Sequence, residues 1–92
     1  MAVKVKLPTI LRKHTDGQAV VEVEGANLGE VLKDLESRHP GITRTILTDD
    51  GAALHRFVNV YVNGEDVRYS GSLATQVSEG DTVSILPAVA GG

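Results

Sequence analysis

The sequence predicts an α+β domain in which one main helix covers one face of a mixed sheet of about four to five strands. Three observations carry this prediction. Short segments near both ends of the chain, and another at 57–62, alternate apolar and polar residues as half-buried strands do. One segment, 28–38, instead repeats its apolar residues at helical spacing. A chain of 92 residues has room for a single hydrophobic core.

The first two strands are expected at 2–7 and 19–24, joined as a hairpin by a long polar loop. Valines alternate with lysines in the first strand and with glutamates in the second. Pro8 ends the first strand, and Asp16-Gly17 is the strongest turn signal between the two.

A helix is expected from residue 28 to residue 38 or 39. Asn27 precedes it and Glu30 follows three residues later, which is the arrangement of a capping box. Pro40-Gly41 ends the helix, because the residue before a proline avoids helical geometry. Its apolar residues fall at i, i+3, i+4 and i+7 and form one stripe: Leu28, Val31, Leu32 and Leu35.

The rest of the chain reads as shorter elements. Residues 42–47 indicate a short helical turn, and 48–56 form a loop with an acidic tip. The strongest strand, 57–62, ends at Asn63-Gly64, a hairpin signal, so a short return strand is expected at 67–69. Residues 70–77 are predicted to form a loop or one irregular helical turn. The tight turn 79–81 leads into a last strand at 82–86, whose pairing Pro87 ends because proline has no N–H.

The composition excludes several classes of function. The formal net charge of −3 argues against binding to a phosphate backbone as the main role. The absence of cysteine excludes disulfides, thiolate zinc sites, iron–sulfur clusters and a cysteine nucleophile. No segment has the length of a membrane span or the pattern of a secretory signal. We therefore expect a cytoplasmic protein with neither a nucleic-acid nor a membrane partner.

Side chains that could hold a metal or perform catalysis are also not arranged for it. The three histidines, His14, His39 and His55, show no i,i+4 pairing, so no metal site is expected. The acidic tip at 49–51 is too short for a calcium loop. No serine or threonine has a histidine and an aspartate at a recognisable spacing, which leaves no candidate catalytic residue.

The C-terminus is the most informative segment. The chain ends in Gly91-Gly92 after five residues, 86–90, without a charged side chain. Because glycine has no Cβ, such a tail fits a slot too narrow for other residues. We predict a domain at 1–87 and a flexible tail at 88–92. The tail would enter a partner enzyme through its backbone and present the Gly92 carboxylate, which is ionised at neutral pH because an α-carboxyl has a pKa of about 3.3–3.7.

The predicted threading segment comprises Pro87, Ala88, Val89, Ala90 and Gly91. The five residues beyond Pro87 extend about 17 Å when fully stretched, and Pro87 stiffens the point where the tail begins. The alternative interpretation is a floppy end with accidental glycines.

A second candidate site lies on the strand at 57–62. Phe57 and Tyr61 share one of its faces, and the valines share the other. No second helix is available to cover the aromatic face, so one hypothesis is a docking surface for a partner enzyme. The alternative is ordinary cross-strand packing on a half-exposed face.

The C-terminal residues resemble a known family signature. An acidic-Gly-Asp turn, an alternating strand and a Pro-x-Val-x-Gly-Gly end are similar to the ubiquitin-like sulfur carriers of the ThiS and MoaD type; here they are Glu79-Gly80-Asp81, 82–86 and 87–92. Segments 8–12 and 54–63 further resemble the branch of this family that serves cysteine biosynthesis. The resemblance implies the β-grasp fold, with the first and last strands parallel at the centre of the sheet.

The resemblance also implies a function. In this family the chain is a protein cosubstrate and not an enzyme, and it binds no cofactor itself. An adenylating enzyme related to ubiquitin-activating enzymes uses ATP and magnesium to form an acyl-adenylate on the terminal carboxylate, here Gly92. A sulfur donor then converts it into a thiocarboxylate. In the cysteine branch, a pyridoxal-phosphate-dependent synthase accepts the sulfur and a metalloprotease releases cysteine from the tail.

Three alternatives share this sequence pattern. Carriers for the thiamin thiazole and for molybdopterin use the same chemistry with another acceptor. A ubiquitin-like modifier uses the same activated tail to form isopeptide bonds with lysines. A plain interaction module would need no reaction at Gly92.

Overall fold

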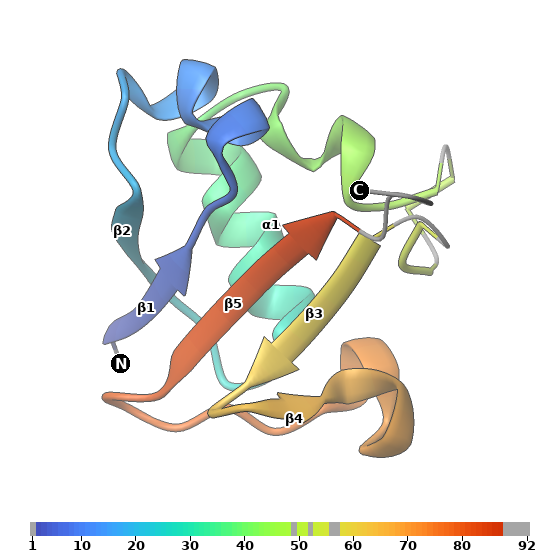
Figure 1. The fold of residues 1–92 in the computed structure, drawn as a ribbon. Helices are drawn as coiled ribbons and strands as arrows, with labels where there is room; N and C mark the ends of the chain where they lie inside the picture. The colour runs from blue at the N-terminus through green and yellow to red at the C-terminus, as the bar shows by residue number, and fades with distance from the viewer. Residues whose placement is uncertain (1, 49, 52, 56–57, 88–92) are drawn as a thin grey trace.

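The computed structural model describes residues 2–48, 50–51, 53–55 and 58–87. Its five strands form one mixed sheet in the order β2-β1-β5-β3-β4, and the helix α1 lies behind this sheet (Figure 1). The elements are β1 (Ala2–Lys6), β2 (Val20–Glu24), α1 (Leu28–Arg38), β3 (Val58–Val62), β4 (Glu65–Asp66) and β5 (Thr82–Pro87). The predicted α+β class, with one main helix on one face of the sheet, is confirmed.

The centre of the sheet is the parallel pair of β1 and β5. Lys4 lies opposite Thr82 and Lys6 opposite Ser84, whereas all other neighbouring strands are antiparallel. Alternate residues of β1, β2, β3 and β5 point toward α1 and are buried, as the alternation in the sequence predicts. The opposite face of the sheet, toward the viewer in Figure 1, carries most of the polar residues of these strands together with exposed apolar ones such as Val20 and Leu86.

The helix α1 begins and ends where the sequence predicts. The Asn27 side chain accepts a hydrogen bond from the Glu30 N–H at 2.9 Å, as a capping residue does. The Glu30 carboxylate reaches back to the N–H of Ala26, also at 2.9 Å, one residue before the partner that a capping box uses. The four residues of the predicted stripe, Leu28, Val31, Leu32 and Leu35, are fully buried against the sheet.

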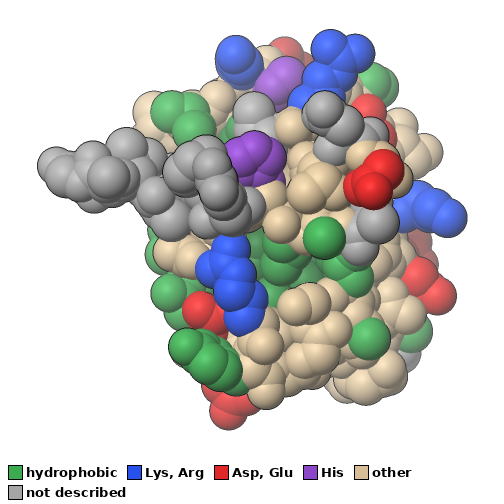
Figure 2. Space-filling model, turned by 90° about the vertical axis from the view of Figure 1, so that its right-hand side faces the viewer, with side chains coloured by type: hydrophobic (Ala, Val, Ile, Leu, Met, Phe, Trp, Pro, Cys, Tyr) green, Lys and Arg blue, Asp and Glu red, His purple; other side chains and the backbone are tan. Residues whose placement is uncertain are grey.

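The segment after α1 forms one wall of an apolar groove. The short 3-10 helix Ile42–Thr45 confirms the predicted turn, and the following loop is closed by an isolated bridge between Leu47 and Leu54. A groove of about 270 Å³ separates this loop from α1, with Leu32, Leu47 and Leu73 in its lining. Hydrophobic side chains are visible in the hollow at the centre of this side of the molecule (Figure 2).

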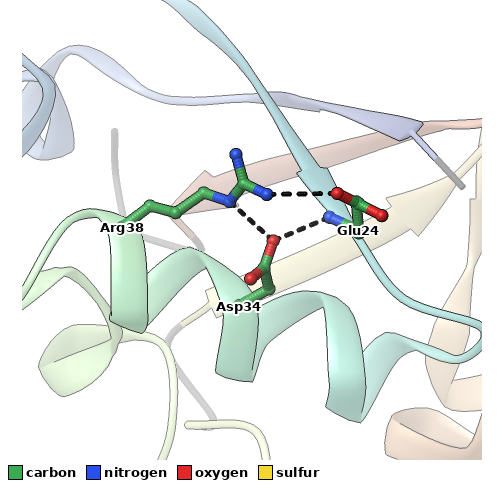
Figure 3. A network of polar contacts seen from close by, with 3 residues as sticks. All are labelled: Glu24, Asp34 and Arg38. Carbon is green, nitrogen blue, oxygen red and sulfur yellow. Dashed lines mark hydrogen bonds and ion pairs between the residues drawn. The ribbon is translucent and has the colours of Figure 1, made fainter.

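A polar network fastens α1 to the outer strand β2 (Figure 3). Asp34 accepts a hydrogen bond from the Glu24 N–H at 2.8 Å and another from Arg38 Nε at 2.8 Å. Arg38 also contacts the Glu24 carboxylate at 3.3 Å. The Glu24 N–H and Arg38 together hold the pKa of Asp34 below its usual value, because both favour the ionised form. The network thereby satisfies one N–H on an edge strand.

Two short elements differ from the prediction. The return strand is Glu65–Asp66, and the predicted strand at 67–69 is instead the 3-10 helix Val67–Tyr69. The turn at Asn63-Gly64 has positive φ at both residues, so Glu65 pairs with Val62 directly after it. The strand then ends because the Asp66 side chain accepts the Arg68 N–H at 2.9 Å and caps the new turn. Another 3-10 helix, Thr9–Thr15, occupies the segment that was predicted to be a long polar loop.

Candidate functional site

The strand β5 is the last described element and leads into residues 88–92. At its start, the Lys4 N–H donates to the carbonyl of Asp81 at 3.0 Å, and the Asn63 N–H donates to the carbonyl of Thr82 at 2.8 Å. Its last residue, Pro87, lies opposite Val58 of β3. The strand is therefore one residue longer than expected, and pairing with β3 includes Pro87. Residues 88–92 lie outside the described residues, so the predicted tail and its Gly92 carboxylate stay predictions.

The Gly-Asp turn of the family signature fixes the beginning of β5. Gly80 has a φ of 85°, and its N–H donates to the carbonyl of Ala2 at 2.9 Å. The Asp81 carboxylate accepts hydrogen bonds from the Asn63 amide at 3.0 Å and from the Ser78 N–H at 2.8 Å. These donors lower the pKa of Asp81, the Asn63 bond being the larger cause. The acidic residue of this motif thus has a structural role at the root of the strand.

The face of the sheet away from α1, here called the open face, contains one of the two predicted docking residues. Tyr61 lies on it, partly exposed, while Val58, Val60 and Val62 point to the core as predicted. Phe57 lies outside the described residues. Pairing places Tyr61 next to Ser84, and Ser84 next to Lys6. The two lysines of β1 therefore lie on the same face as Tyr61.

Leu86 is a candidate docking residue that the sequence prediction missed. It is 48% exposed and lies opposite Asn59 on the open face, directly before Pro87. Its place follows from the alternation along β5, since Val83 and Ile85 point inward. On the open face, Tyr61 and Leu86 thus lie diagonally across β3 and β5, with Asn59 and Ser84 beside them. Lys4 and Lys6 lie on the neighbouring strand β1, and Lys4 is opposite Glu22 of β2.

Arg68 borders the same face on the other side, at the beginning of β3. Its guanidinium donates to the Asn59 side chain at 2.6 Å and to the carbonyl of Val58 at 2.7 Å. A basic residue thereby lies beside the strand pair from which the tail leaves. The sequence could not predict that Arg68 lies beside this face, because Arg68 belongs to the short turn after β4, which shows no periodic pattern.

The described residues hold no group of three or more histidine, aspartate or glutamate side chains placed to bind a metal ion. Likewise, none of the helices in the described ranges is both long and apolar enough to cross a bilayer.

Comparison with known proteins decides the family. Residues 5–92 match the profile of the ThiS family. The chain belongs to the ThiS family. It is 55% identical to the sulfur carrier protein CysO of Mycobacterium tuberculosis over 93 residues, which cover both chains completely.

Solved structures of similar proteins have the same fold. CysO of Amycolatopsis orientalis, solved in a complex with BexX, superposes with a TM-score of 0.91 at 56% identity, over 98% of this chain and 99% of that one. The small archaeal modifier protein SAMP1 of Haloferax volcanii superposes with a TM-score of 0.81 at 29% identity over the whole of both chains. The fold is thus the ubiquitin-like β-grasp. The role is that of a sulfur carrier, a protein cosubstrate on which enzymes act.

Proposed function

We propose that this carrier serves cysteine biosynthesis and holds sulfur as a thiocarboxylate on Gly92. The observation that supports this most is the 55% identity to CysO over the full length of both chains, the Gly-Gly end included. A carrier of this kind needs a stable body and a free carboxylate. The β-grasp domain is the body, and Gly92 supplies the carboxylate.

The proposed reaction has two steps and uses catalytic groups of the partner. A Gly92 carboxylate oxygen attacks the α-phosphorus of ATP, so a C–O–P bond forms and pyrophosphate leaves with magnesium bound to it. Sulfide from a donor then attacks the acyl carbon and AMP leaves, which replaces one carboxylate oxygen by sulfur. The chain contributes an ionised nucleophile to the first step because its terminal carboxyl has a low pKa. It has no cysteine that could intercept the acyl-adenylate.

The proposed acceptor is a pyridoxal-phosphate-dependent cysteine synthase, after which a metalloprotease releases cysteine and regenerates the Gly-Gly end. Carriers for thiamin thiazole and molybdopterin stay as alternatives, because the tail chemistry is common to all three. A lysine-conjugated modifier also stays as an alternative, since SAMP1 shares the fold.

We further propose that the open face docks the adenylating enzyme while the tail enters its active site. CysO of Amycolatopsis orientalis forms a complex with the protein BexX, which supports docking on a partner protein as a property of such carriers. Tyr61 and Leu86 offer partly exposed apolar side chains close to Pro87, and Lys4 and Lys6 of β1 offer positive charge beside them, with Glu22 opposite Lys4. The fitting partner surface is apolar at its centre and acidic where it meets β1.

Intact-mass measurement tests the function directly. The chain is incubated with an adenylating enzyme of a CysO-containing organism, ATP, magnesium and sulfide, and is then weighed. Replacement of one oxygen by sulfur on the C-terminal peptide supports the proposal. A control chain that carries one additional residue after Gly92 keeps the body intact and should gain no sulfur.

The acceptor is tested next with the loaded carrier. Transfer of sulfur to the serine-derived substrate of a cysteine synthase supports the cysteine branch. Transfer only to a thiazole or molybdopterin precursor, or lysine conjugates in place of a thiocarboxylate, would contradict it.

A further inference from the structure

The pairing of β1 with β5 ends at a position defined by two prolines. In a parallel pair each strand donates at every second residue, and the Lys4 N–H to the carbonyl of Asp81 fixes which residues donate. The last pair of this ladder is Lys6 with Ser84. Continuing the same register by two residues would require the N–H of residue 8 and the N–H of residue 87. Both are proline, so neither donor exists.

Both strands are still extended where the ladder stops. Pro8 has φ −70° and ψ 161°, which is β geometry, and the Leu7 N–H still donates to the carbonyl of Ala19 on the β2 side. β5 continues to Pro87 on the β3 side. The Pro8 carbonyl accepts a hydrogen bond from the Leu11 N–H at 3.0 Å, at the start of the 3-10 helix Thr9–Thr15. On β1 the pairing therefore ends where the missing N–H of Pro8 coincides with this turn, and on β5 it ends at the missing N–H of Pro87.

Pro87 removes no hydrogen bond from the pairing of β5 with β3. The Asn63 N–H bonds to the carbonyl of Thr82, which makes that pair a hydrogen-bonded one. Bonded and non-bonded pairs alternate, so the Val58–Pro87 pair, five residues further, is non-bonded. The nitrogen of residue 87 therefore faces β1, and an N–H there could continue the pairing of β5 with β1.

We propose that Pro8 and Pro87 together form a stop that fixes the residue at which the chain leaves the sheet, and thereby the length of the tail available to the adenylating enzyme. This inference rests on the proposed function. With donors at both positions, residue 8 would donate to the carbonyl of Ile85, and residue 87 would donate to the second lone pair of the residue 8 carbonyl, which already accepts from Leu11. An enzyme would have to break the hydrogen bond of residue 87 before enclosing the backbone from residue 88 onward. The prolines are positioning residues, since the reacting carboxylate belongs to Gly92.

The test restores the donors. In the double variant Pro8→Ala/Pro87→Ala, the amides of residues 8 and 87 should exchange with solvent at least about tenfold more slowly than in an unpaired peptide. The KM of the variant in sulfur loading should rise about tenfold, as the loss of one net hydrogen bond (~1.4 kcal/mol) implies, with kcat unchanged. Inserting two alanines between Ala88 and Val89 should restore KM, because threading then begins beyond the hydrogen bond of residue 87.

Pro40→Ala is the matched control, since Pro40 is the one other proline in the sequence and lies outside the sheet. It should change neither KM nor the exchange of β5. Amides at 8 and 87 that exchange as in an unpaired peptide would overturn the inference, and so would an unchanged KM despite protection. Failure of the wild-type chain to gain sulfur would instead refute the proposed function, while the exchange measurement still decides whether the prolines stop the ladder.

Discussion

Asn63 and Asp81 join the turn after β3 to the beginning of β5 through their side chains. The Asn63 amide nitrogen donates to Asp81 at 3.0 Å, and its amide oxygen accepts the Thr82 N–H at 3.0 Å. Asn63 also has a φ of 52°, a left-handed conformation that asparagine tolerates better than most residues. One residue thus both makes the hairpin turn and positions the strand that carries the tail.

Replacing Asn63 should therefore destabilise the fold. We expect Asn63→Ala to lower the free energy of unfolding by about 2 kcal/mol, since two hydrogen bonds are lost and alanine is strained at positive φ. Asn63→Gly loses the same bonds without the strain and should cost about 1 kcal/mol less. Urea denaturation measures both. Equal costs for the two variants would show that the left-handed conformation contributes nothing.

Stability should decrease in acid because three carboxylates are more acidic in the folded protein. Glu36 accepts hydrogen bonds from the Gly41 N–H, at 2.7 Å, and from the Thr43 hydroxyl and N–H, and these donors lower its pKa from the usual 4.5. The pKa values of Asp34 and Asp81 are lowered as well, from the usual 3.8. A depressed folded pKa stabilises the protein above the unfolded pKa, and this stabilisation is lost as pH falls through the folded value.

The melting temperature should therefore be nearly constant from pH 7 to about pH 5 and fall below about pH 4.5. Glu36→Gln should make the fall shallower, because one of the titrating groups is gone. Glu22→Gln is the control, since within the described part of the chain the Glu22 side chain makes no hydrogen bond or ion pair. A melting temperature that rises on acidification would contradict the assignment of these hydrogen bonds.

Gly25 is required by a close approach between the end of β2 and α1. A Cβ at this position would lie 2.6 Å from the Val31 nitrogen and 2.9 Å from the Glu30 carbonyl carbon, and backbone atoms cannot move aside cheaply. We expect Gly25→Ala to destabilise the protein by about 3 kcal/mol, as overpacking does.

Gly17→Ala gives the comparison for Gly25→Ala. An added Cβ there meets nothing within 4 Å, but φ is +87°, so only the backbone strain of about 1 kcal/mol remains. Chemical denaturation of both variants measures the difference. A Gly25→Ala cost no larger than that of Gly17→Ala would show that the chain relaxes around the new methyl group.

The sequence predicted the elements that have a strong local signal. The stripe of α1 and its cap at Asn27 fixed the helix within a residue, and the alternation in β1, β2 and β5 fixed their inward faces. The parallel contact of β1 with β5 came from the family resemblance alone, because residues 4 and 82 are joined by no local pattern. The prediction of the short elements after β3 was wrong, because a two-residue strand and a three-residue 3-10 helix are too short to show a period in the sequence.

The candidate site was predicted in part. Tyr61 followed from the alternation along β3. Leu86, Lys4 and Arg68 were missed as members of the same face, because their proximity depends on the strand order β1-β5-β3 and on a turn that the sequence assigned to a strand. The proposed joint role of Pro8 and Pro87 could not be predicted either. In the sequence each proline marks the end of its own strand, and only the register of β1 with β5, continued by two residues, brings the two together.

The open face should tolerate substitution without loss of stability but not without loss of docking. We expect Tyr61→Ala and Leu86→Ala each to raise the KM of sulfur loading by about tenfold with kcat unchanged, because an apolar contact at an interface centre contributes about 1–2 kcal/mol.

The exposed lysines of the open face should affect the rate of association. Charge reversal of Lys4 and Lys6 should slow association with the adenylating enzyme and weaken its dependence on salt, as charges at an interface rim do. Lys33→Glu on the exposed side of α1 changes the net charge by the same amount per residue and serves as the control. Stopped-flow association at several salt concentrations measures the effect, and equal slowing by Lys33→Glu would mean that net charge, and not the open face, directs docking.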